Sequence, residues 1–275
     1  MRKKSVLITG SSGFIGSHLV DKISQKTILF GKRDNLLSRE KVLQLKRTDV
    51  VIHLASKVPG RNQGKKEKFF ENNVLGTLNI LEYCVKKKVE KLIFISSSVY
   101  GKPQRNPVNE KHPVIHNNPY TKSKILAEEL CKAYAKEYGL KVIILRLANV
   151  FGKFQKEGFL IANFYKSLQE NKPIKIINKK SKRDFIFVDD VIDAILLMID
   201  YECGFEIFNV GSGKSYSFEK ILQIFEKNYG VELKKSFSEN KTNFIPKMEL
   251  DISKIKQKTG WYPKISLEEG FKKIL

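Results

Sequence analysis

Tyr120 and Lys124 are the residues of this sequence whose types and spacing best suit proton transfer. They are four positions apart, and Pro119 suits the first position of a helix that would place both side chains one turn apart on one face. A phenol loses its proton near pH 10, but a lysine ammonium one turn away favours the phenolate and lowers that pKa. The spacing predicts that Tyr120 exchanges a proton with a substrate oxygen, although an ordinary helix surface can also carry such a pair.

A run of serines supplies the second hydroxyl that such chemistry needs. Ser96-Ser97-Ser98 follows residues 91–95, whose apolar side chains indicate a buried strand. In an open α/β sheet, ligands bind outside the carboxyl ends of the strands, which is where these hydroxyls would lie. One of the serines could then hold the substrate oxygen while Tyr120 moves its proton.

The start of the chain predicts a site for phosphate. Residues 6–9 indicate a strand, Gly10, Gly13 and Gly16 follow, and apolar side chains then recur with the period of a helix. Such a turn lets backbone N–H groups approach a pyrophosphate without an intervening Cβ, and the helix N-terminus adds a favourable dipole. The GxxGxxG spacing is one residue longer than the GxGxxG dinucleotide fingerprint, and alone it also fits a tight turn with close helix packing.

The next strand, at residues 26–30, ends in Gly31-Lys32-Arg33. In a dinucleotide-binding fold an acidic residue at this place binds the 2′-hydroxyl of NAD, whereas a cation suits the 2′-phosphate of NADP. Lys32 and Arg33 therefore favour NADP. NAD stays possible, because in a lysine-rich chain two adjacent cations can occur without any role in cofactor binding.

The elements between these motifs alternate between strands and helices. Residues 49–56 indicate a buried strand, in which His53 is expected to be a core histidine with a backbone hydrogen-bond partner. Residues 66–87 indicate an amphipathic helix with Asn73 as its inward-facing polar exception. This alternation predicts an α/β fold with a doubly wound parallel sheet.

Composition narrows the class of protein. A chain of 275 residues with 41% apolar residues can bury a sizeable core, and no apolar run approaches the roughly 18 residues of a membrane span, so we expect a cytoplasmic protein without membrane association. The net charge of +22 suggests nucleic acid, but the lysines are spread over nearly every expected element, so nucleic-acid binding is not expected. Cys84, Cys131 and Cys203 lack metal or disulfide spacing, which indicates buried reduced thiols and no metal site.

Further motifs extend the pattern along the chain. They are Asn73-Val74-x-Gly76-Thr77, Val99-Tyr100-Gly101, residues 145–152, residues 183–191, residues 208–213 and Gly260-Trp261-Tyr262-Pro263. Together with the glycine turn and the Tyr120-Lys124 pair, they occur in the order and spacing of the extended short-chain dehydrogenase/reductase superfamily. Over essentially its whole length the chain resembles the NAD(P)-dependent epimerase/dehydratase, or nucleotide-sugar, branch of that superfamily.

The resemblance implies a fold and a division of the chain. Residues 1–152 and 184–209 would form a Rossmann-type NAD(P)-binding domain, and residues 153–183 and 210–275 a smaller, C-terminal substrate-binding lobe. The helices at residues 66–87 and 120–138 would pair with their copies in a homodimer.

The resemblance also implies roles for individual residues. The catalytic set would be Ser97, Tyr120 and Lys124; Ser97 is chosen because the preceding strand fixes its position, whereas counting back from Val99-Tyr100-Gly101 would select Ser96. Ser97, Asn149 and Arg183 would bind the substrate, the last two through its diphosphate. The cofactor-binding residues would be Gly10, Gly13, Phe14, Ile15, Gly16, Lys32, Arg33, Asp34, Leu36, Leu54, Ala55, Lys57, Asn73, Tyr120 and Lys124.

Departures from the family pattern narrow the reaction. Ser98 and Val99 stand where the 4,6-dehydratases have an acidic pair, and the serine cluster lacks the nearby cysteine of the GDP-fucose synthase type. The resemblance therefore implies an enzyme that transfers hydride at a nucleotide-diphosphate sugar, either a 4-epimerase or a reductase of a 4-keto sugar. The compact, basic region at residues 30–49 is more similar to the reductases. The alternative is a protein that binds NADP without turnover, as a redox sensor or an RNA-associated factor.

Overall fold

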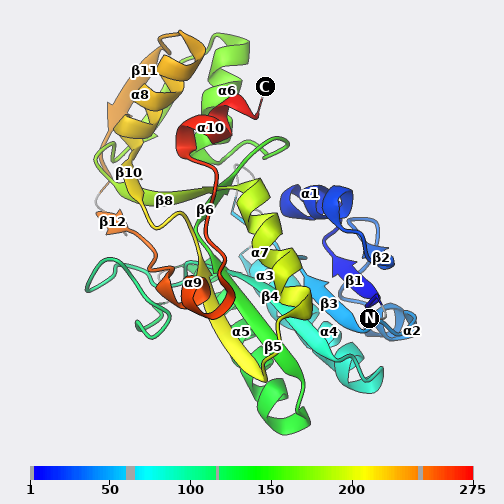
Figure 1. The fold of residues 1–275 in the computed structure, drawn as a ribbon. Helices are drawn as coiled ribbons and strands as arrows, with labels where there is room; N and C mark the ends of the chain where they lie inside the picture. The colour runs from blue at the N-terminus through cyan, green and yellow to red at the C-terminus, as the bar shows by residue number, and fades with distance from the viewer. Residues whose placement is uncertain (1–2, 60–65, 116–117, 241–243, 275) are drawn as a thin grey trace.

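The computed structural model describes residues 3–59, 66–115, 118–240 and 244–274. Within these residues, six parallel strands form the central sheet in the order β2-β1-β3-β4-β5-β9, with helices on both faces (Figure 1). The predicted α/β fold with a doubly wound parallel sheet is confirmed. The strands are β1 (Val6–Thr9), β2 (Thr27–Phe30), β3 (Val50–His53), β4 (Lys91–Ser97), β5 (Lys141–Leu147) and β9 (Phe205–Val210).

The order of the strands reverses at β1. From β1 the chain passes to β2 on one side and then crosses to β3 on the other, so Val6 is paired with both Thr27 and Val50. In open α/β sheets the crevice beyond the carboxyl ends at such a switch point is where ligands bind. The topology therefore predicts a ligand crevice beyond Thr9 and His53, the last residues of β1 and β3.

Apolar side chains alternate along the strands between two covered faces. Val6 and Ile8 belong to one hydrophobic cluster together with residues of α7 (Val188–Asp200). Leu7, between them, belongs to a second cluster with residues of α4 (Gly76–Lys86) and α5 (Pro119–Tyr138). Successive strand side chains point to opposite faces, so a strand buried on both sides reads as a continuous apolar run.

Two long helical runs cover the second face. The helix expected at residues 66–87 is present as α3 (Glu67–Phe70), the π-helical turn η1 (Glu71–Leu75) and α4. Helix α5 begins at Pro119, and the Asn118 side chain accepts a hydrogen bond from the Thr121 N–H at 2.9 Å. This cap fixes the first turn of α5, which carries Tyr120. The shorter helices α1 (Phe14–Lys22) and α2 (Arg39–Gln44) follow β1 and β2.

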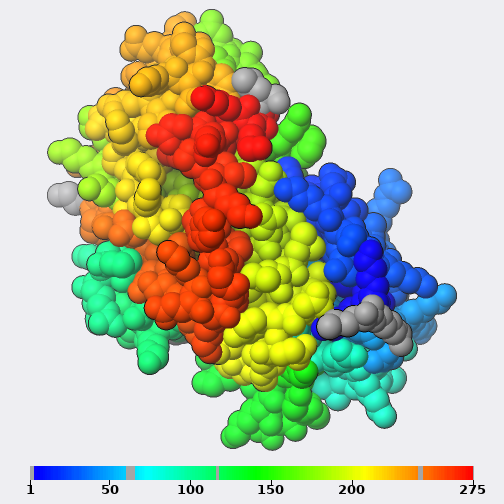
Figure 2. All heavy atoms as spheres, in the orientation of Figure 1, coloured from blue at the N-terminus to red at the C-terminus, as the bar shows by residue number. Residues whose placement is uncertain are grey.

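The later part of the chain adds smaller sheets beyond the carboxyl edge of the central sheet (Figure 1). Their side chains continue the cluster that contains α7, so no break in the hydrophobic core marks the predicted division into domain and lobe within the described chain. In Figure 2 the C-terminal residues, coloured orange to red, lie beside α7. The elements are β6 (Asn149–Phe151), α6 (Leu160–Glu170), β7 (Ile174–Ile177), β8 (Lys182–Phe187), β10 (Ser215–Ser217), α8 (Phe218–Tyr229), β11 (Lys235–Ser238), β12 (Lys247–Met248), α9 (Ser253–Thr259) and α10 (Leu267–Lys272).

A buried lysine holds the end of α7. The Lys91 ammonium donates to the carbonyls of Met198 and Ile199, at 3.2 and 3.0 Å, and to that of Tyr201. Its side chain is 2% exposed. Because the last carbonyls of a helix lack intrahelical partners, a cation at this end satisfies them. Among the helices described, none has the length and apolar character needed to cross a membrane.

Candidate active site

The glycine turn is shaped by close backbone contacts. Gly10 has a φ of +71°, and a Cβ there would lie 2.6 Å from the Ala55 nitrogen. A Cβ at Gly16 would lie 2.1 Å from the Gly10 carbonyl oxygen. Gly13 is the N-cap of α1, so the free N–H groups of its first turn, which includes Phe14 and Ile15, face this turn. The glycines allow a tightly packed turn, and the free N–H groups of the helix N-terminus follow it. This arrangement suits a pyrophosphate.

The segment after β3 lies across the glycine turn. Leu54 N–H donates to the Thr9 carbonyl, and Ala55 N–H donates to the Thr9 hydroxyl, each at 3.2 Å. The Asn73 side chain accepts from Lys57 N–H at 2.7 Å and donates to the Lys57 carbonyl at 3.0 Å. The structure therefore brings four of the predicted cofactor-binding residues together beside the carboxyl ends of β1 and β3.

The basic turn after β2 lies beside the glycine turn. Lys32 N–H donates to the Ser12 hydroxyl at 2.8 Å, which ties this turn to the glycine turn. The Asp34 carboxylate accepts from Gly31 N–H at 2.6 Å. The side chains of Lys32, Arg33 and Asp34 are exposed. Leu36, the last predicted cofactor residue of this turn, is buried, with its side chain against Gly76 at the start of α4.

Ser97 and Tyr120 lie side by side at the carboxyl end of β4. The Ser97 side chain is near enough to the Tyr120 phenol to act on its pKa as a hydrogen-bond partner, and both residues are half-buried. Burial raises the pKa of Tyr120, and the Ser97 side chain opposes the rise. The expectation that the tyrosine has a lowered pKa is thus wrong for this arrangement, because burial outweighs the groups that favour the phenolate.

Lys124 lies beneath this pair with its charge directed into the sheet. Its ammonium donates to the Ile95 carbonyl at 2.7 Å and lies 4.2 Å from the centre of the Phe94 ring. The residue is 2% exposed. Burial lowers the pKa of Lys124 to about 8, against the opposing attraction of the Glu128 carboxylate. At neutral pH the lysine is therefore a buried cation one turn from Tyr120.

Ser96 points away from Tyr120 into a buried ion pair. Its hydroxyl donates to Glu128 at 2.5 Å, and Glu128 pairs with Arg146 at 2.6 Å. Arg146 also donates to the Tyr100 hydroxyl at 3.2 Å. The hydrogen bonds of Glu128 and Arg146 thus hold Ser96, near the end of β4, in place. Of the two serines considered from the sequence, Ser97 is therefore the one on the side of Tyr120.

Two of the three predicted substrate residues, Asn149 and Arg183, lie on neighbouring strands of the smaller sheet. Strand β6, which begins with Asn149, pairs with β8, which contains Arg183. The Asn149 amide donates to the Asp184 carbonyl at 2.9 Å, and the Arg183 guanidinium donates to the Ile245 carbonyl at 2.8 Å. Burial lowers the pKa of Arg183 to about 10. The guanidinium also lies over the Phe218 ring, at 5.6 Å from its centre.

His53 differs from the sequence expectation in its partners. It is a core histidine, 1% exposed, but its ring nitrogens contact the side-chain hydroxyls of Thr9 and Thr77 rather than backbone groups. Thr77 belongs to one of the quoted family motifs, but neither threonine was among the predicted site residues. One signal in the sequence could have indicated Thr9. It is a hydroxyl residue at the last position of a buried strand, directly before Gly10, and a buried polar side chain there needs a hydrogen-bond partner.

A comparison with protein families decides the assignment of the chain. The sequence profile of the NAD dependent epimerase/dehydratase family matches residues 6–211. The chain belongs to this family. Its members are enzymes, and the glycine turn, Ser97, Tyr120 and Lys124 all lie within the matched residues.

Individual relatives and solved structures agree with the family. A Methanocaldococcus jannaschii protein provisionally named a UDP-glucose 4-epimerase is 33% identical, over 98% of this chain and 97% of its own length. The dTDP-4-dehydro-6-deoxyglucose reductase of Escherichia coli is 29% identical, over 100% and 97%. The structure of the Thermotoga maritima UDP-glucose 4-epimerase with UDP-glucose superposes with a TM-score of 0.92 at 29% identity, covering 98% of this chain and 97% of that one.

Structures of two further relatives contain a nicotinamide cofactor. The Thermus thermophilus UDP-glucose 4-epimerase, in complex with NAD, matches with a TM-score of 0.90 at 27% identity, and RMD from Pseudomonas aeruginosa, complexed with NADPH, matches with 0.88 at 26%. Each covers 98% or more of this chain and 97% of its own. A nicotinamide dinucleotide is therefore supported for the family fold, without a preference for either form.

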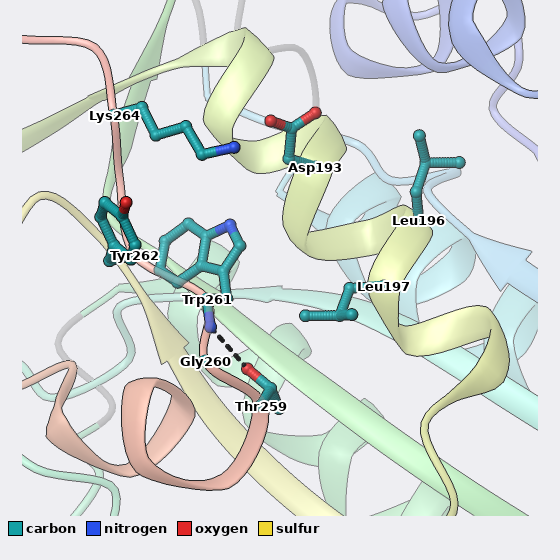
Figure 3. A pocket seen from close by; sticks show the side chains of 8 residues that line it. All are labelled: Asp193, Leu196, Leu197, Thr259, Gly260, Trp261, Tyr262 and Lys264. Carbon is teal, nitrogen blue, oxygen red and sulfur yellow. Dashed lines mark hydrogen bonds between the residues drawn. The ribbon is translucent and has the colours of Figure 1, made fainter.

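One family motif supports the fold rather than the site. The Trp261 indole N–H donates to the Asp190 carbonyl at 3.3 Å, and the Asp190 carboxylate accepts from Lys264 N–H at 2.9 Å. Beside Trp261 a surface groove of about 630 Å³ opens between α7 and residues 259–264 (Figure 3). Within the described chain, the residues that line this groove include none of those predicted for the site.

Proposed function

We propose that this enzyme is a nucleotide-sugar 4-epimerase in which Tyr120 removes and returns the proton of the sugar 4-hydroxyl. The observation that carries the proposal is the placement of the Ser97 side chain beside the Tyr120 phenol at the carboxyl end of β4, with the buried Lys124 ammonium one turn along α5. A serine beside a tyrosine can also hold the substrate oxygen from which the proton moves. The dinucleotide, when bound, would supply the hydride acceptor and donor for the sugar carbon.

The crevice predicted beyond β1 and β3 fits that cofactor. We assign the pyrophosphate to the glycine turn, because Gly10 and Gly16 let the backbone pack tightly there and the first N–H groups of α1 face this turn. The segment from Leu54 to Lys57, held by Asn73, would border the nicotinamide ribose, and Lys124 would hold its hydroxyls. The first turn of α1, with Phe14 and Ile15, and the turn from Gly31 to Leu36 would complete the site.

The substrate side is assigned to the smaller sheets. Asn149 and Arg183 lie on paired strands, and a guanidinium matches the forked oxygens of a diphosphate. Arg183 would exchange its present contact with the Ile245 carbonyl for those oxygens. Residues 153–183 and 210–275 would then act as the substrate lobe, with residues 158–163 closing on the sugar nucleotide.

A 4-keto-sugar reductase is the second candidate, and the basic turn after β2 favours it. Lys32 and Arg33 are exposed beside the glycine turn, whereas the Asp34 carboxylate is already bound by Gly31 N–H. We infer that this turn gives a preference for NADP over NAD, and a reductase consumes NADPH. The 4-epimerase is placed first because epimerases are prominent among the relatives, including the neighbour with a TM-score of 0.92.

Incubation with a panel of UDP-, GDP- and dTDP-sugars, with and without NADPH, separates these candidates. A change in stereochemistry without net consumption of NADPH identifies the epimerase, and consumption of NADPH identifies the reductase. Tyr120→Phe is expected to lower turnover by about 10²- to 10⁴-fold while dinucleotide affinity is retained. Tyr138→Phe, at the exposed end of the same helix, is the matched control. Undiminished turnover in Tyr120→Phe would refute the mechanism.

The cofactor preference has its own test. The double variant Lys32→Ser, Arg33→Ser is expected to weaken NADP binding and leave NAD binding unchanged, because only NADP carries the 2′-phosphate. Lys41→Ser, an exposed lysine on α2, is the control for a general loss of positive charge. Equal affinities for NADP and NAD in the unaltered protein would contradict the preference.

Two further expectations complete the proposal. Leu75 and Leu126 are 53% and 40% exposed on η1 and α5, which supports a homodimer through these helices, and sedimentation of the purified protein tests it.

A dinucleotide-binding protein without turnover, associated with RNA, would instead show strongly salt-dependent RNA binding. Absence of RNA binding near physiological salt, together with turnover of a nucleotide sugar, excludes that alternative.

A further inference from the structure

A row of buried polar side chains lies at the carboxyl ends of β1 and β3. Thr9 and His53 are the last residues of their strands and stand opposite each other in the β1–β3 register. The Thr9 hydroxyl lies 2.6 Å from His53 Nδ1, and the Thr77 hydroxyl of α4 lies 3.1 Å from His53 Nε2. The exposed fraction of each of the three residues is 1% or less. Buried polar groups of this kind need partners, and here each one finds them within the row.

The hydrogen bonds of this row have a determined direction. The Thr77 hydroxyl donates to the Asn73 carbonyl at 2.7 Å, so toward His53 it can only accept, and the proton of the imidazole must be on Nε2. Nδ1 is then an acceptor, to which the Thr9 hydroxyl donates. The Thr9 oxygen in turn accepts from Ala55 N–H at 3.2 Å.

Protonation of the imidazole would break this order. A second ring proton, on Nδ1, would face the hydroxyl proton of Thr9, whose oxygen already accepts from Ala55. Burial, together with the positive charge of Lys124, lowers the pKa of His53 to about 3. The neutral ring with its proton on Nε2 is thus the form that completes the row at any pH above this range.

The row continues on the other side into the proposed catalytic helix. The Asn73 amide donates to the Ser123 hydroxyl at 2.9 Å as well as to the Lys57 carbonyl. The Ser123 hydroxyl donates to the Tyr120 carbonyl at 2.7 Å. Asn73 and Ser123 are also almost fully buried, at 1% and 0% exposure. Hydrogen bonds therefore link the glycine turn to the first turn of α5.

We propose that His53 is a positioning residue, whose neutral imidazole fixes the segment after β3, and through Asn73 the helix that carries Tyr120, relative to the glycine turn. The sheet ladder ends at Thr9 and His53, so beyond them the backbone needs other contacts to hold its place. Hydrogen bonds in a dry interior are strong and leave little freedom to the groups they join. This inference rests on the proposed function, because it assumes that a dinucleotide binds in the crevice.

Variants of Thr9 and His53 test this role. Thr9→Val and His53→Leu are expected to weaken the binding of NAD and NADP about tenfold or more, because each leaves a buried polar partner unsatisfied next to the cofactor segment. Thr9→Ser and His53→Gln, which keep a hydroxyl or a neutral donor–acceptor pair, are expected to restore most of the affinity. Dissociation constants from nicotinamide fluorescence or calorimetry are the readout, and they need no sugar substrate.

Thr48→Val is the matched control for stability. Thr48 is as buried as Thr9, at 1% exposure, and its hydroxyl contacts Tyr83 at the opposite end of β3. Its variant is expected to lose free energy of unfolding like Thr9→Val while its dinucleotide affinity stays unchanged. Equal affinities of the two variants would overturn the inference.

Three other outcomes would also contradict the inference. If His53→Gln removes a limb from the pH profile of kcat/KM, His53 acts in acid–base catalysis instead of positioning the segment. If the unaltered protein binds no dinucleotide, the proposed function fails and the inference fails with it. Normal dinucleotide binding by Thr9→Val in an enzyme that turns over nucleotide sugars would refute the inference alone.

Discussion

Lys124→Met is expected to make the protein more stable at pH 7 while it removes activity. The side chain is 2% exposed, and its ammonium meets one carbonyl, that of Ile95, and the Phe94 ring. Burial of a cation with so few partners is costly, whereas methionine has a similar length and no charge. A residue kept at a cost in stability is typical of an active site.

The magnitude follows from the pKa of Lys124. Burial lowers this pKa from 10.5 to about 8, and at 1.36 kcal/mol for each pKa unit the difference corresponds to about 3.4 kcal/mol. Part of the gain is lost because the Ile95 carbonyl loses a donor, at about 1 kcal/mol. We therefore expect Lys124→Met to raise the free energy of unfolding by about 2 to 3 kcal/mol at pH 7.

The gain has a defined dependence on pH. Because the pKa is lower in the folded than in the unfolded protein, the unfolded chain binds this proton more tightly, and the cost is fully present below about pH 8. The cost disappears as the pH rises from about 8 to 10.5, since the unfolded lysine then also loses its proton. The stability difference between Lys124→Met and the unaltered protein should shrink over that window.

Urea unfolding at pH 7 and at about pH 10 measures this difference. Lys122→Met is the control, because Lys122 lies two residues earlier on the same helix and is exposed, so its replacement should change stability by less than about 0.5 kcal/mol. A loss of stability in Lys124→Met, or a gain that is the same at both pH values, would refute the reasoning.

Three further predictions concern the glycine turn, the buried Glu128–Arg146 ion pair and the buried Lys91. Gly16→Ala places a Cβ 2.1 Å from the Gly10 carbonyl oxygen, so we expect a loss of about 1 to 3 kcal/mol together with weakened dinucleotide binding, measured by unfolding and titration. Glu128→Gln leaves the Arg146 guanidinium buried without its counter-charge and should cost about 3 to 5 kcal/mol, part of which Arg146→Met should recover; an unchanged unfolding midpoint would contradict this. Lys91→Met removes the donor to the last carbonyls of α7 and should speed amide hydrogen exchange in that turn, with dinucleotide affinity unchanged.

Much of the fold could be predicted because its signals are local. The apolar run of β1, the three glycines and the helical spacing of α1 follow one another within 17 residues, from Val6 to Lys22, and strand and helix periods are read directly from such a window. Pro119 and the turn spacing of Tyr120 and Lys124 likewise predicted the start of α5. The helical run predicted at residues 66–87 was found in the same way, from the spacing of its apolar residues.

The partners of the polar side chains could not be predicted, because they come from distant parts of the chain. His53 meets Thr9 across 44 positions and Thr77 across 24, and both contacts depend on the order of the strands and the docking of α4. The same holds for the two serines, since only the pairing of β4 with β5 and the packing of α5 direct Ser96 to Glu128 and Ser97 to Tyr120.

The sequence by itself determined which residues we propose for the chemistry, and the tertiary structure decided in which direction burial shifts their pKa values. Tyr120 and Lys124 follow from residue type and spacing, but the direction of their pKa values follows from burial, which a spacing of four residues does not reveal. The reason is that the cost of a buried charge depends on every group packed around it. Those groups are assembled only when the sheet and its helices come together.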